Sequence, residues 1–155
     1  MVETATKSVS RQLLLLIAVL VFSTLVWMAV RRMRDLMMLG YVDSAIGRVR
    51  TVAAAEEQFA KAHPEIGYTC SLSQLPHDEL ITGLVAKNQK YNGYLFEIVG
   101  CKASAPKKPN LIYQITARPL RSGLPAFCSD DSGIVKSDYG GSVEKCLANG
   151  VPLGN

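Results

Sequence analysis

Residues 13–30, LLLLIAVLVFSTLVWMAV, form an eighteen-residue run that contains no charged residue, no glycine and no proline. As an α-helix, a run of this length extends about 27 Å, close to the roughly 30 Å hydrocarbon thickness of a bilayer. A cleavable signal peptide has a shorter apolar core and small residues at its cleavage site, whereas Arg31, Arg32 and Arg34 follow this run directly. The sequence therefore predicts an uncleaved membrane-spanning segment over 13–30, preceded by a short flank over 1–12. The alternative, a buried helix of a soluble core, would normally carry a polar stripe.

An amphipathic pattern continues beyond the apolar run and predicts further helix over 31–62. Helix-compatible geometry ends at His63-Pro64, because proline lacks the backbone donor and restricts the residue before it. Gly40 and Gly47 interrupt the pattern, either as points of bending or as close packing contacts. One face of this helix repeats apolar or small residues three or four apart: Leu39, Val42, Ile46, Val49, Ala53 and Phe59. We expect the sheet to cover this face, above all its C-terminal half, whereas Leu39 and Val42 are expected to matter little to the sheet domain and are candidates for association between helices.

Residues 63–155 are enough for one small domain if the amphipathic helix contributes to its core. β-Prone runs occur at 94–99, 111–118, 126–128 and 134–136, and the turn-forming stretches 106–110, 122–123 and 130–133 separate them. A short helix is expected over 76–84. The predicted fold class is therefore α+β, with a long N-terminal helix whose second half packs on a small antiparallel sheet.

Four cysteines, Cys70, Cys101, Cys128 and Cys146, all fall within this second part of the chain. Zinc is disfavoured because structural zinc ligands usually come in close pairs, and no C-x-x-C occurs. Disulfides fit a small domain better and persist in an oxidising compartment. Three connectivities are open, of which we favour Cys70–Cys101 with Cys128–Cys146. Free thiols in a cytosolic protein are the alternative.

Charge concentrates at the flanks of the apolar run. Residues 1–35 hold five basic and two acidic side chains, whereas 36–155 hold twelve and eleven, so no basic face for nucleic acid is expected. Lys7 and Arg11 precede the run and three arginines follow it, which slightly favours a cytoplasmic second domain. The cysteines favour the opposite orientation. We follow the cysteines, because long domains translocate largely regardless of charge.

Residues that carry chemistry are few. His63 and His77 are the only histidines and belong to no metal-ligand or nucleophile signature, so no enzyme activity and no cofactor are expected. Asp130 and Asp131 in the stretch DDSG are a calcium candidate, but the spaced acids and terminal glutamate of a calcium loop are absent. A hairpin turn is the favoured interpretation of this stretch.

Five stretches in this order resemble the type IV pilins and the pseudopilins of type II secretion, over roughly residues 46–146: VRTVAAAE (49–56), GYTCSL (67–72), LITGL (80–84), GYLFEI (93–98) and FCSDDSGIV (127–135). The succession of an apolar helix, an amphipathic continuation and a cysteine-containing β domain is similar as well. The resemblance implies a pilin-like head and a structural role in a filament or secretion apparatus, without catalysis. Its implied partners are membrane lipid and pilin or secretion-apparatus subunits, including further copies of this chain.

The N-terminal stretch departs from that family. Prepilins have a glycine before the cleavage point and a glutamate early in the mature helix, whereas residues 7–14 read KSVSRQLL. Two functions therefore remain open. One is a structural subunit of a type IV pilus or pseudopilus, or an unprocessed relative. The other is a permanently anchored periplasmic binding module that does not polymerise. Both place the chain in a bacterial inner membrane as a single-pass protein, with residues 63–155 periplasmic or extracellular.

Overall fold

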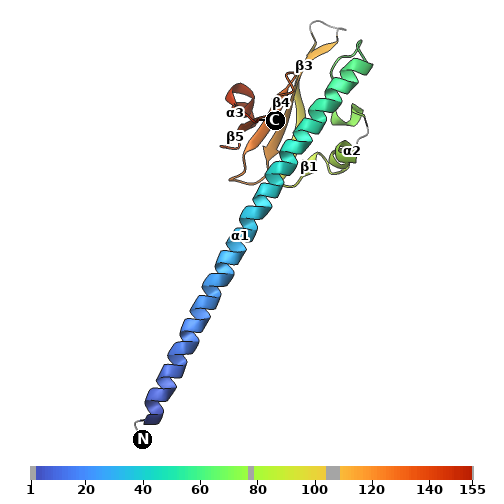
Figure 1. Cartoon of the computed structure of the whole chain (residues 1–155). Coiled ribbons are helices and arrows are strands. Elements are labelled where there is room, and N and C mark those ends of the chain that lie inside the picture. The colour runs from blue at the N-terminus through green and yellow to red at the C-terminus, as the bar shows by residue number, and fades with distance from the viewer. Residues whose placement is uncertain (1–2, 77–78, 104–108, 155) are drawn as a thin grey trace. The chain divides into compact units, whose positions relative to one another are not determined.

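A computed structural model describes residues 3–76, 79–103 and 109–154, with side chains from residue 13 onward except at 102 and 103. It is an α+β structure with one long helix and a six-stranded antiparallel sheet (Figure 1). Its contacts divide the chain into two compact units, Met1–Leu39 and Gly40–Asn155. The elements in chain order are α1 (Glu3–Ala62), the 3-10 helix η1 (Leu72–Gln74), α2 (Glu79–Ala86), β1 (Lys90–Tyr91), β2 (Tyr94–Ala103), β3 (Asn110–Pro119), β4 (Ala126–Asp130), β5 (Lys136–Asp138), α3 (Val143–Asn149) and β6 (Val151–Pro152).

The helix α1 ends at Ala62, directly before His63-Pro64, as the sequence predicts. It runs through Gly40 and Gly47 without interruption, and a Cβ added at either glycine would meet nothing within 4 Å. The interpretation of these glycines as close packing contacts is therefore wrong. The compact second unit begins at Gly40 rather than at residue 63, because the last part of α1 packs with the sheet.

The sheet is a simple meander in which each strand pairs with the next, in the order β1 to β6. Its centre is the β2–β3 pair, with Phe96 opposite Ala117 and Ile98 opposite Ile115. The two long predicted strands are confirmed, and β4 extends the predicted 126–128 to Asp130. The predicted turn over 106–110 lies largely outside the described residues.

Several short elements differ from the prediction. The last strand before α3 occupies Lys136–Asp138 rather than 134–136, because the turn after Asp130 continues through Ile134, which is half exposed. The described part of the short helix begins at Glu79 and continues to Ala86. The sequence analysis missed β1, β6 and α3, although Ser142 caps α3 by accepting a hydrogen bond from the Lys145 N–H.

The core lies between the last part of α1 and one face of the sheet (Figure 1). Val49 and Ala53 of the predicted helix face are buried, and Val42, Ile46 and Phe59 are half-buried against the same cluster. Leu39 belongs to the other unit and is 61% exposed, so it is not part of the core of the sheet domain. Val52 and Ala45 are buried members of this face that the prediction omitted.

We expect Val49→Ala and Val52→Ala each to lower the free energy of unfolding by about 1–3 kcal/mol, because each side chain is fully buried and leaves a cavity. Leu39→Ala is the matched control and should change it by less than about 0.5 kcal/mol. The measurement is guanidinium unfolding of the full chain in nonionic detergent, followed by tyrosine near-UV circular dichroism. All six tyrosines lie between residues 41 and 139, so this signal reports the second unit. Equal effects at Leu39 and Val52 would mean that α1 does not complete the core.

Candidate functional site

The apolar segment 13–30 is uncovered on all sides within the described chain. Its large apolar side chains are each 46–70% exposed, with Phe22 the most exposed and Val26 the least. Its mean hydropathy reaches 2.8 over an eighteen-residue window, which makes this helix a candidate membrane span. A helix that is apolar all round needs lipid or other helices as its surroundings.

The two hydroxyl side chains of this segment bond within the helix. The Ser23 hydroxyl donates to the Leu20 carbonyl at 2.9 Å, and the Thr24 hydroxyl donates to the Val21 carbonyl at 2.8 Å. Hydroxyls paired in this way enter hydrocarbon without leaving an unsatisfied donor. The segment is therefore compatible with a bilayer in its polar groups as well as in its length.

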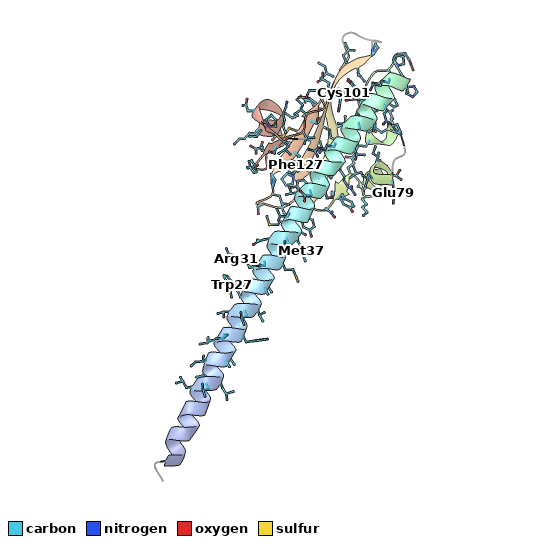
Figure 2. All side chains as sticks on the ribbon, in the orientation of Figure 1. Trp27, Arg31, Met37, Glu79, Cys101 and Phe127 are labelled. Carbon is cyan, nitrogen blue, oxygen red and sulfur yellow. A yellow bond between two sulfur atoms is a disulfide. The ribbon has the colours of Figure 1, made fainter. Side chains whose placement is uncertain are left out.

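A tryptophan and an arginine mark the end of the segment, on adjacent turns of α1 (Figure 2). The Arg31 guanidinium carbon lies 5.3 Å from the centroid of the Trp27 ring. Tryptophan is enriched where a membrane helix meets water, and arginine there faces the headgroups. Exposed apolar side chains continue among the arginines, at Met33, and beyond them, at Leu36, Met37, Met38 and Leu39.

A second feature is a carboxyl group buried in the sheet unit. Glu56 of α1 is fully buried, and its Oε2 accepts a hydrogen bond from the Thr69 N–H at 2.9 Å. Its Oε1 has no hydrogen-bond partner in the described structure. Burial raises the pKa of Glu56 from 4.5 to about 7, against the opposing effect of the Thr69 bond. Glu56 is therefore largely protonated below neutral pH.

We expect Glu56 to make the stability of the second unit fall as pH rises from about 4.5 to about 7. Over that range the folded state keeps the Glu56 proton while the unfolded state releases it. The free energy of unfolding therefore falls by on the order of 3 kcal/mol in total, and this decrease ends near pH 7. Denaturant unfolding of the full chain at a series of pH values measures it. Glu56→Gln should remove this part of the pH slope. The control Glu57→Gln, at an exposed position paired with Lys61, should keep it. The same slope in both variants would refute the assignment.

The four cysteines form one disulfide and one pair of thiols. Cys128 of β4 is bonded to Cys146 of α3, with 6.0 Å between their Cα atoms, which confirms that predicted pairing. Cys70 and Cys101 are free, so the structure does not contain the second predicted bridge. Instead the Cys101 thiol donates to the Thr69 carbonyl at 3.3 Å, and the Cys70 sulfur accepts from the Asn110 amide at 3.4 Å. The two thiols are also hydrogen-bonded to each other.

The two thiols differ in their surroundings. Cys70 is exposed, whereas Cys101 is half-buried. Burial raises the pKa of Cys101 to about 12, and the hydrogen bond with Cys70 and the charge of nearby Glu56 act in the same direction. A raised pKa removes the thiolate that reacts with electrophiles.

We expect iodoacetamide at pH 8 to modify Cys70 at least about tenfold faster than Cys101 in the folded chain, because Cys101 is shielded and almost fully protonated. Mass spectrometry of the full chain without reductant should find two alkylated thiols and one intact Cys128–Cys146 bridge. Cys70→Ser serves as the control and should leave only the slow modification. A chain with no reactive thiol would mean that Cys70 and Cys101 are joined, and four reactive thiols would exclude both bridges.

The stretch DDSG forms a hairpin turn. Gly133 has a φ of 72°, and its N–H donates to the Asp130 carbonyl at 2.9 Å. The Asp130 carboxylate accepts from Ser132 and forms a 2.8 Å ion pair with Lys136. Burial raises the pKa of Asp130, but these hydrogen bonds outweigh it and the net shift is downward. The Asp130 carboxylate is thus bonded to residues of this chain, and the neighbouring Asp131 is exposed. In the part of the chain that the structure describes, no group of three metal-binding side chains occurs.

The sequence analysis missed two buried polar residues of α1, Arg48 and Glu56. Both lie at helical spacing from Val52, at i−4 and i+4, so the periodicity that identified the apolar face also included them. Of the two histidines, His63 packs its ring against the ring of Phe59, with 4.6 Å between the ring centroids. His77 lies outside the described residues.

Comparisons with protein-family models, with curated proteins and with solved structures found no match to this chain.

Proposed function

We propose that this chain is a membrane-anchored structural protein of pilin-like type, either a subunit of a type IV pilus or type II secretion pseudopilus or an unprocessed relative. The observation that carries the proposal is the extent of uncovered apolar surface on α1. Exposed apolar side chains continue from Leu13 to Leu39, past the three arginines. A helix of 27 residues is about 40 Å long, more than the roughly 30 Å of hydrocarbon in a bilayer.

Lipid alone therefore does not cover this surface. The side chains of Leu36, Met37 and Leu39 follow charged residues that belong at the membrane surface, so they need a protein partner. A neighbouring copy offers the same apolar helix, and side-by-side helices would cover both parts of the surface at once. The same helix continues into the core of the sheet unit, so an array of helices would carry that unit with it.

A second candidate function is a permanently anchored binding module that does not polymerise. Residues 13–30 contain no carboxylate, and this absence favours the anchored module. A carboxylate in lipid is costly but can dock one helix specifically on another, so a helix without one lacks that means of assembly. In both functions we place residues 40–155 on the oxidising side of a bacterial inner membrane, in the periplasm or outside the cell. The Cys128–Cys146 disulfide supports this placement because such bonds persist in oxidising compartments.

Site-specific photo-cross-linking in native membranes distinguishes the two functions. A photoreactive phenylalanine derivative at Met37, 53% exposed beyond the arginines, should give an adduct of twice the monomer mass if α1 packs against a second copy. The same derivative at Phe22 tests the apolar segment itself. The control position is Lys145, an exposed residue of α3 in the other unit.

Adducts with copies of this chain, or with other apolar helices, from Met37 and Phe22 but not from Lys145 would support the structural subunit. Lipid adducts alone from both positions would refute it and leave the anchored module. The mass of the mature N-terminus, measured on the same preparation, reports whether a leader is removed.

A further inference from the structure

Two cations share one tyrosine ring at an edge of the sheet. The Arg48 guanidinium carbon lies 3.5 Å from the centroid of the Tyr91 ring, and the Lys87 ammonium nitrogen lies 4.7 Å from it. Arg48 comes from α1, Lys87 follows the end of α2, and Tyr91 belongs to the edge strand β1. Three elements of the same compact unit thus bring these side chains together.

Among the residues that the structure describes, this cluster has no counter-ion. Arg48 is only 8% exposed, and its Nε is buried without an acceptor. The ion pairs among the described residues lie elsewhere, and none includes Arg48, Lys87 or the neighbouring Lys90. A buried charge without a charged partner is costly, and a tyrosine ring offsets only part of that cost. Both cations lie close to the same ring, so their positive charges add, and an anion beside them would lower the free energy of both.

The backbone around the cluster is held in an uncommon conformation. Asn88, Gln89 and Asn92 have φ values of 51°, 64° and 43°, in the left-handed region that side chains other than glycine rarely adopt. The N–H of Gln89 donates to the Leu84 carbonyl at 2.7 Å, and the Gln89 carbonyl accepts from Phe96 at 2.9 Å. These bonds fix the stretch that carries Lys87 and Tyr91. The site is therefore formed before any ligand arrives.

We propose that Arg48, Lys87 and Tyr91 form a binding site for an acidic side chain of a protein partner. A carboxylate accepts hydrogen bonds from the guanidinium and the ammonium together, which the Tyr91 ring alone cannot do. The apolar side chain of Val85, 40% exposed near the end of α2, lies on the same part of the chain and suits a peptide rather than a free inorganic anion. This site does not depend on how the apolar part of α1 is covered, so it stands or fails separately from the proposed function.

The test is a titration of the full chain, labelled with nitrogen-15 at arginine, in nonionic detergent at low salt. The probes are a blocked tetraglutamate peptide, the matching tetraglutamine peptide and inorganic phosphate, and the Arg48 Nε–H resonance is observed. We expect a saturable shift with tetraglutamate only. Lys87→Gln, at an exposed position, should weaken the apparent affinity about fivefold or more, and the Arg48 Nε–H resonance remains observable in this variant. Lys145→Gln is the control, because it removes one positive charge elsewhere on the same unit.

The absence of a saturable shift, or equal weakening by Lys87→Gln and Lys145→Gln, would overturn the proposal. Saturation by phosphate without saturation by tetraglutamate would overturn the assignment to a protein partner. The Lys87 variant is not expected to perturb folding, because Lys87 is exposed and is not part of the buried core.

Discussion

The second unit depends on the burial of one helix face against the centre of the sheet. Val49 and Val52 of α1 are completely buried against a cluster that includes Tyr94, Phe96 and Ile115. A small sheet with one face on water requires such a cover, because a few short strands cannot enclose a core by themselves. The disulfide and the caps add to this packing without replacing it.

The same helix serves two different environments. Residues 13–30 of this helix are apolar on every side, whereas beyond Gly40 the helix has one buried face and one exposed face. The buried face also carries Glu56, whose carboxyl has one satisfied and one unsatisfied oxygen. A protonated carboxyl is tolerated there because it needs fewer partners than a charged one. The core is therefore adapted to one protonation state of a single residue.

The large features of this fold could be predicted from the sequence because each has its own periodicity. The apolar run, the end of α1 at His63-Pro64 and the strands β2 and β3 are set by local pattern. The presence of a disulfide could be predicted from the small size of the domain and the spacing of its cysteines, whereas the pairing Cys128–Cys146 was one choice among three open connectivities. The contacts of the Cys101 thiol with Thr69 and of the Cys70 sulfur with Asn110 arise from tertiary packing, which no local pattern contains. Short elements such as β1 and β6 exist only because a longer neighbour pairs with them.

The sheet ends in a very short strand on each side. The edge strands β1 and β6 have two residues each, and β6 includes Pro152, which lacks a backbone donor. Strands this short offer few backbone groups to template another chain, and short edge strands are a common protection against amyloid-like aggregation. The proposed association of copies through helices and side chains would therefore meet little competition from strand pairing at β1 and β6. Such contacts can be reversible and selective in a way that a growing β-sheet is not.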